Sequence, residues 1–172
     1  MEWEEIRQRT LRWVQPKVFH RVYELRAGEQ PVGSLEFEKA FSSNATAKLA
    51  GWTWSFEREG FLGRQFRVIQ AGTTGSFAVF QQDWRSNGEL TMADGSKVAW
   101  KRQNFWGTDW VFLTASEQRM VGFKDAFSLK LAAQVKLRYD YVDRPEMPLL
   151  VALGCYLLVL HRRKRQRHPG GA

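Results

Sequence analysis

The sequence predicts a mainly β protein, a closed antiparallel barrel of about 12 strands around a central hydrophobic C-terminal α-helix. Short segments of alternating apolar and polar side chains fill residues 18–141, and turn dipeptides such as Asn87-Gly88 and Asp94-Gly95 separate them. The one long uncharged run, residues 147–160, is apolar on every side and therefore needs enclosure on every side. A barrel of about eight strands is filled by side chains alone, whereas about eleven or twelve strands leave room for a helix.

The N-terminal segment, residues 1–17, is expected to hold a short helix outside the barrel. Acidic residues at Glu2, Glu4 and Glu5 suit the positive end of a helix dipole, and the pair Gln15-Pro16 ends the helical pattern. The barrel domain is then expected over residues 18–160.

Eleven strands are expected between this segment and the apolar run. In the clearest one, Trp52, Trp54 and Phe56 share one face and polar residues stand between them, which is the period of a half-buried strand. The expected strands cover residues 18–26, 32–39, 44–49, 52–57, 64–70, 76–82, 89–93, 97–103, 108–114, 119–124 and 129–141.

The apolar run is expected to be the central helix of the barrel. At 1.5 Å per residue, 14 residues span about 21 Å, less than the roughly 30 Å of a hydrocarbon core. A membrane-anchored domain with residues 147–160 as a short transmembrane segment remains the alternative. The side chains expected to fill the barrel are Leu149, Leu150, Val151, Leu153, Cys155, Tyr156, Leu157, Leu158 and Leu160.

Composition narrows the classes of function. The 172 residues carry 26 Lys and Arg against 18 Asp and Glu, a net charge of +8, but five of these cations and no acid lie beyond residue 160. The body is therefore nearly balanced, and because no Lys/Arg stripe crosses it, nucleic acid is not an expected partner. The single cysteine excludes an internal disulfide and is compatible with a cytoplasmic location.

No pattern of catalytic or metal-ligating residues stands out. His20, His161 and His168 lack the spacing of a zinc site, and His20 is expected within a strand. Cys155 lies in the apolar run, where an inert buried thiol is expected. Residues 28–34 begin like a phosphate-binding loop but lack its lysine. We therefore expect a non-catalytic module with no catalytic residue, metal site or cofactor.

Soft aromatic-and-glycine motifs carry a resemblance to a known family. The segment 54–61 reads Trp-x-Phe-x-Arg-x-Gly-Phe, and the pattern of residues 61–69 returns 44 residues later at 105–113. With the terminal apolar helix, these motifs resemble the tubby C-terminal-like superfamily (tubby domains, scramblases and plant LURP-one-related proteins), and most closely its uncharacterised bacterial members. The resemblance covers residues 18–165 and implies a 12-stranded barrel around a hydrophobic helix.

The functions of that superfamily are not carried over by this resemblance. Tubby domains bind phosphoinositides through basic residues on one barrel face, and scramblases have a calcium-binding acidic segment and acylated cysteines; the body of this chain shows no matching motif. A shared fold is not a shared activity.

Residues 161–172 are expected to form a basic, disordered tail. Its cations would emerge from one end of the barrel, and the favoured interpretation is a solvated end that complements the helix dipole. The functional alternative is salt-sensitive docking on an anionic membrane surface or a phosphoinositide, at about 1 kcal/mol per cation, or on a protein partner. The expected lipid contacts are Arg162, Arg163, Lys164, Arg165 and Arg167.

Overall fold

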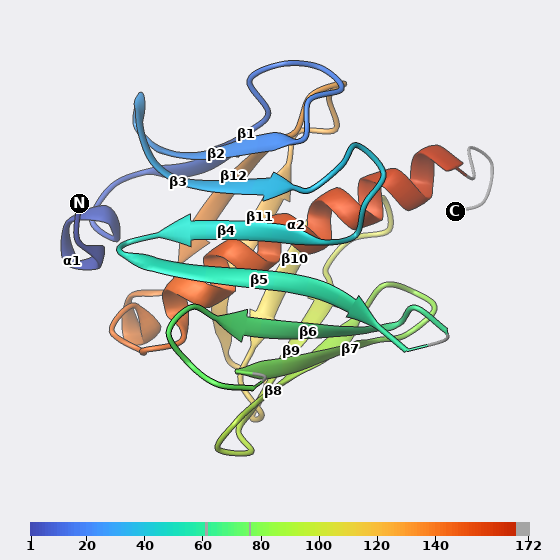
Figure 1. The fold of residues 1–172 in the computed structure, drawn as a ribbon. Helices are drawn as coiled ribbons and strands as arrows, with labels where there is room; N and C mark the ends of the chain where they lie inside the picture. Colours follow the sequence, from blue (N-terminus) through green and yellow to red (C-terminus); the bar gives the residue numbers. More distant parts are fainter. Residues whose placement is uncertain (61, 76, 168–172) are drawn as a thin grey trace.

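The computed structural model describes residues 1–60, 62–75 and 77–167 and has the form of a closed antiparallel barrel of 12 strands (Figure 1). Each strand pairs with its neighbours in sequence, and the first pairs with the last to close the sheet. The predicted fold class is confirmed. The strands are β1 (Leu11–Val14), β2 (Val22–Ala27), β3 (Gln30–Phe37), β4 (Ala45–Leu49), β5 (Trp52–Glu59), β6 (Gln65–Gln70), β7 (Ala78–Gln82), β8 (Gly88–Met92), β9 (Lys97–Arg102), β10 (Asp109–Leu113), β11 (Arg119–Asp125) and β12 (Ala132–Leu137).

Strand β1 is not among the strands that the sequence predicts. The sequence pattern places residues 1–17 in a helical segment outside the domain, but the helix α1 spans only Trp3–Ile6 and Leu11–Val14 forms a barrel strand. Trp13 pairs with Ala133 of β12 and Leu25 of β2, so the barrel begins before residue 18. Four residues are too few for alternation to be distinguished from one face of a helix.

Two other expectations at the strand ends are wrong. His20 lies in the exposed loop between β1 and β2 rather than in a strand. The last strand ends at Leu137, and the following residues form the 3₁₀ turn η1 (Tyr139–Tyr141), in which Tyr139 is exposed. Apolar alternation continues past the strand because Tyr139 and Tyr141 happen to keep the period of two.

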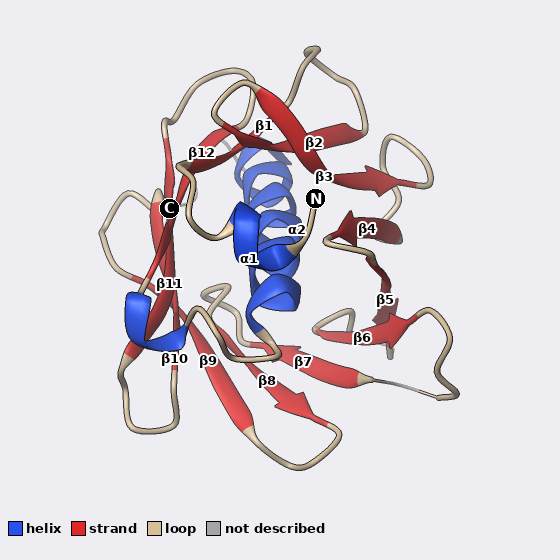
Figure 2. Ribbon diagram, turned by 90° about the vertical axis from the view of Figure 1, so that its left-hand side faces the viewer, coloured by secondary structure: helices blue, strands red, loops and turns tan. Residues whose placement is uncertain are grey.

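Helix α2 (Met147–Arg167) runs through the middle of the barrel (Figures 1 and 2). Residues 147–160 are all buried, and the strands enclose them on every side. The ring of Tyr156 lies 5.0 Å from that of Phe56 and 5.7 Å from those of Phe37 and Phe66, and its hydroxyl donates a 2.6 Å hydrogen bond to the Ser43 carbonyl. A Cβ on Gly154 would lie 2.1 Å from the ring of Phe123, so this position admits only glycine without repacking.

The alternative of a short transmembrane segment is not favoured. The apolar run is the core of the barrel, and no helix among the described residues is both long enough and apolar enough to cross a membrane.

The helix is longer than the sequence predicts. The prediction ends it at residue 160 and continues with a disordered tail, but residues 161–167 extend α2 as regular helix. Residues 168–172 of the expected tail lie outside the described residues. Side chains of this last part contact the barrel rim, which is a tertiary stabilisation that local sequence does not reveal.

Candidate functional site

Strand order brings six loops together at one end of the barrel. Because consecutive strands are antiparallel neighbours, every second loop lies at the same end, and α2 emerges among these six. We call this the exit end; it lies at the right of Figure 1. Its described residues are the loops 15–21, 38–44, 60 with 62–64, 83–87, 103–108 and 126–131, together with helix residues 161–167.

Each loop of the exit end presents at least one large apolar side chain to solvent. These eight side chains are 62% to 89% exposed. At the opposite end, the large apolar side chains described as exposed are Met1, Trp52 and Tyr139. Soluble domains seldom gather so much exposed apolar surface without a partner. We call the following eight residues the apolar ring: Phe19, Phe41, Leu62, Trp84, Phe105, Trp106, Phe127 and Leu129.

The backbone at two ring positions has an unfavourable conformation. Phe19 and Phe127 have φ angles of 63° and 56°, in the left-handed region that bulky residues rarely adopt. Such conformations cost on the order of 1–3 kcal/mol and cluster at binding sites. The Phe127 amide donates to the Asp125 carboxylate, which helps to hold this loop. The fold therefore maintains the outward position of these two rings against a backbone cost.

The apolar ring leaves a signal in the sequence that residue-by-residue alternation does not reveal. Phe19, Phe41, Leu62, Trp84, Trp106 and Phe127 follow one another at intervals of 22, 21, 22, 22 and 21 residues, which is one member per hairpin. The repeat 44 residues apart is two such hairpins. Its glycines, Gly63 and Gly107, both have positive φ, directly after a ring residue; Phe61, the first residue of the repeat, lies outside the described residues.

The two ends of the barrel differ in charge. The exit end carries eleven Lys and Arg and two Asp and Glu, a net charge of +9. The opposite end (residues 1–10, 28–29, 50–51, 71–75, 77, 93–96, 114–118 and 138–146) carries four Lys and Arg and nine Asp and Glu, a net charge of −5. The exit-end cations are Lys17, Arg21, Lys39, Arg64, Arg85, Lys130, Arg162, Arg163, Lys164, Arg165 and Arg167, and its acids are Glu38 and Asp83.

Arg162, one of the five predicted lipid contacts, is buried. Its side chain is 9% exposed and forms a 2.8 Å ion pair with Asp125, which is 2% exposed. It also donates to the carbonyls of Ser128 and Leu129. Arg162 therefore fastens α2 to β11 and the following loop, and little of its side chain is accessible.

The other four predicted cations reach the surface to different degrees. Arg163 is half-buried: it donates to the Ser42 carbonyl and lies 4.1 Å from the centre of the Phe37 ring. Lys164 is exposed and donates a 2.9 Å bond to the Trp84 carbonyl. The guanidinium of Arg165 lies over the ring of Phe127, and Arg167 is exposed. The structure thus places the end of α2 against three of the exit-end loops.

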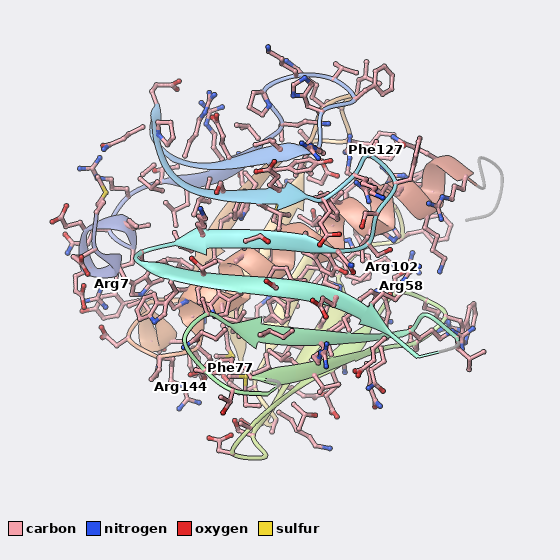
Figure 3. The ribbon with its side chains drawn as sticks, in the orientation of Figure 1. Arg7, Arg58, Phe77, Arg102, Phe127 and Arg144 are labelled. Carbon is pink, nitrogen blue, oxygen red and sulfur yellow. The ribbon has the colours of Figure 1, made fainter. Side chains whose placement is uncertain are left out.

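A cavity of about 670 Å³ opens between the last three loops of the exit end and α2. Four cations and four members of the apolar ring line it, and no carboxylate does. Two of the lining residues, Arg102 and Phe127, are labelled in Figure 3. The lining residues are Trp84, Arg85, Ser86, Arg102, Phe105, Trp106, Phe127, His161, Lys164 and Arg165.

The pKa of His161, which lines this cavity, reflects the positive charge around it. Burial, with repulsion from Arg165, Arg102 and Lys164, lowers the pKa of His161 to about 4. Its Nδ1 and the Nη1 of Arg165 are buried without a hydrogen-bond partner among the described residues. The cavity is therefore electrostatically suited to an anionic group.

The described residues hold one thiol and no cluster of metal-ligating side chains. Among those residues, no three His, Cys, Asp or Glu side chains gather in a way that could hold a metal ion. Cys155 is fully buried, and burial raises the pKa of its thiol well above the usual range.

Comparison with family models, curated proteins and solved structures finds no match to this chain. Nothing in these comparisons links it to the tubby C-terminal-like superfamily, so that resemblance remains a prediction from the quoted motifs.

Proposed function

We propose that this protein is a non-catalytic module that docks reversibly on anionic membranes through the exit end of its barrel. The observation that carries the proposal is that all six exit-end loops present the apolar ring at the same end as the concentrated positive charge. Aromatic side chains favour the membrane interface, and cations favour anionic headgroups. The cytoplasmic leaflet, which is rich in anionic lipid, is the matching surface.

Two contributions of similar size support reversible docking. Partial insertion of a large apolar side chain contributes about 1 kcal/mol, below the 1.5–3 kcal/mol of full burial. Each cation near the surface contributes about 1 kcal/mol at moderate ionic strength. Reversible anchors commonly combine one apolar and one polybasic signal in this way.

The geometry also sets an orientation. The six loops surround the axis of α2, so simultaneous contact of the apolar ring with a flat surface places that axis along the membrane normal. The cavity beside His161 then faces the headgroups, where its four cations can receive a lipid phosphate.

Vesicle co-sedimentation tests the proposal. We expect the protein to bind vesicles of phosphatidylcholine mixed with phosphatidylglycerol, to bind pure phosphatidylcholine much more weakly, and to be released by high salt. A triple variant, Trp84→Ser, Trp106→Ser and Phe127→Ser, should lose about 100-fold in affinity, because about 1 kcal/mol per side chain is about 3 kcal/mol in all.

Matched controls lie at the other end of the barrel. Tyr139 is 90% exposed there, so Tyr139→Ser should leave vesicle binding unchanged. Arg144→Gln removes a cation from that end, whereas Arg167→Gln removes one from the exit end and should weaken binding. Equal loss from both ends, or equal binding to neutral and anionic vesicles, would contradict the proposal; a protein partner for the apolar ring would then be the remaining explanation.

A further inference from the structure

A second cavity, of about 440 Å³, lies at the opposite end of the barrel beside the start of α2. Helix α1 covers the neighbouring part of this end, where Trp3 and Ile6 are buried and Trp3 Nε1 donates a 2.8 Å bond to the Val142 carbonyl (Figure 2). The space between α2 and strands β5, β6 and β8 remains unfilled. Mouths of β-barrels are common positions for small-molecule sites.

The walls of this mouth cavity are aromatic and apolar. Trp52 and Trp54 lie on the inward face of β5, with ring centres 6.3 Å apart and planes 20° apart. Phe77 and Met92 add to the wall, and Phe77 is labelled in Figure 3. Trp54 Nε1 already donates to the Gln70 side chain at 3.1 Å, so the polar edge of this indole is satisfied. Trp52 is 41% exposed, which leaves its ring accessible from solvent.

The charged side chains that line the mouth cavity are both acidic. Asp94 accepts bonds of 2.6 and 2.9 Å from the Ser96 hydroxyl and amide, which lower its pKa and keep it ionised. Glu146 is 19% exposed and has one cationic neighbour, Arg144, at 3.4 Å. Arg144 is 54% exposed and does not line the cavity. No described Lys or Arg lines it, and the loops of this end have a net charge of −5.

We propose that the mouth cavity binds a small organic cation, an ammonium or trimethylammonium group carried on an apolar body. Indole faces attract cations through the ring quadrupole, most strongly where water is excluded. Asp94 and Glu146 add Coulomb attraction at the rim, and the same two carboxylates repel an anion. The mouth cavity lies at the end of the barrel opposite the exit end, so this proposal does not depend on lipid docking.

Titration of the full-length protein with three probes tests this proposal. Benzyltrimethylammonium, benzyl alcohol and benzylsulfonate share the benzyl group and differ in charge. With the indole N–H resonances of Trp52 and Trp54 as the readout, we expect saturable binding of the ammonium probe, at least about tenfold tighter than that of benzylsulfonate. Benzyl alcohol should fall between the two.

Variants locate the binding. Trp52→Ala should weaken the ammonium probe at least about fivefold, and its partial exposure means that the fold tolerates the change. Glu146→Gln should weaken that probe while leaving benzyl alcohol unchanged. Trp106→Ala removes an exposed indole from the other end and should have no effect. Equal affinity for the three probes, insensitivity to Trp52→Ala in a variant with an unchanged melting temperature, or no saturable binding of the ammonium probe would each overturn the proposal.

Discussion

Replacing Asp125 with alanine would leave the Arg162 guanidinium buried beside α2 without its carboxylate. The two groups are 2.8 Å apart, with 9% and 2% of their side chains exposed. Removal of one partner of a buried ion pair costs about 3–5 kcal/mol, because the remaining charge is neither paired nor hydrated. Arg162 keeps its bonds to the Ser128 and Leu129 carbonyls, so the lower figure of about 3 kcal/mol is expected here.

Urea unfolding followed by circular dichroism measures this cost. At a slope of about 2 kcal/mol per molar urea, a loss of about 3 kcal/mol lowers the midpoint by roughly 1.5 M. Arg162→Met should also destabilise, because it leaves Asp125 buried with one amide donor, that of Phe127.

The double variant, Asp125→Ala with Arg162→Met, decides the interpretation. If the ion pair fastens the end of α2, the double variant should lose at least about 1–2 kcal/mol less than the two single losses added together. Simple addition of the single losses would show that the two side chains act independently and that the pair does not hold the helix end. Weaker vesicle binding by the single variants, measured under fully folded conditions, would connect this fastening to docking.

Three further changes test the core and the electrostatics. Gly154→Ala places a Cβ against Phe123 and should cost at least about 1–3 kcal/mol in the same urea assay. Cys155 should react with a thiol reagent slowly in the folded protein and rapidly in denaturant, since it is fully buried; fast labelling of folded protein would contradict a central helix. The pKa of His161 falls from 6.5 to about 4 on folding, so the unfolded state binds the extra proton between these values. Stability should therefore decrease as pH falls from about 6.5 to 4, and His161→Gln should reduce that slope relative to wild type.

The barrel and its central helix could be predicted from sequence because burial leaves a direct pattern there. Inward side chains alternate along strands such as β5, and a helix enclosed by strands is apolar all round. Strand β1 could not be recognised from its four residues alone. It is defined by the pairing of Trp13 with β2 and with β12, and β12 lies about 120 residues further along the chain. Likewise, the continuation of α2 depends on Asp125, 37 residues before Arg162.

The candidate site was harder to predict because its apolar residues recur once per hairpin, whereas the patterns that reveal strands and helices recur every two to four residues. A large apolar residue every 21 or 22 positions becomes a ring only once strand order places alternate loops at one end. The predicted basic segment does lie at this end. Some of its cations are held in contacts with the barrel and others are exposed, and the sequence does not show which, because the contacts are tertiary. Arg162 and Arg163 are used largely by the fold, whereas Lys164 and Arg167 remain exposed.

The same helix connects the two ends of the barrel and explains why they can differ. Its apolar part supplies most of the core that the strands enclose, so many loop side chains at both ends lie outside that core. Its basic end adds five of the eleven cations at the exit end, while its start forms one wall of the acidic mouth cavity. Because the mouth cavity lies at the other end of the barrel, docking at the exit end would leave it open on the side away from the membrane. The two proposed ligands, a lipid surface at the exit end and a small cation at the mouth cavity, would therefore not compete for the same residues.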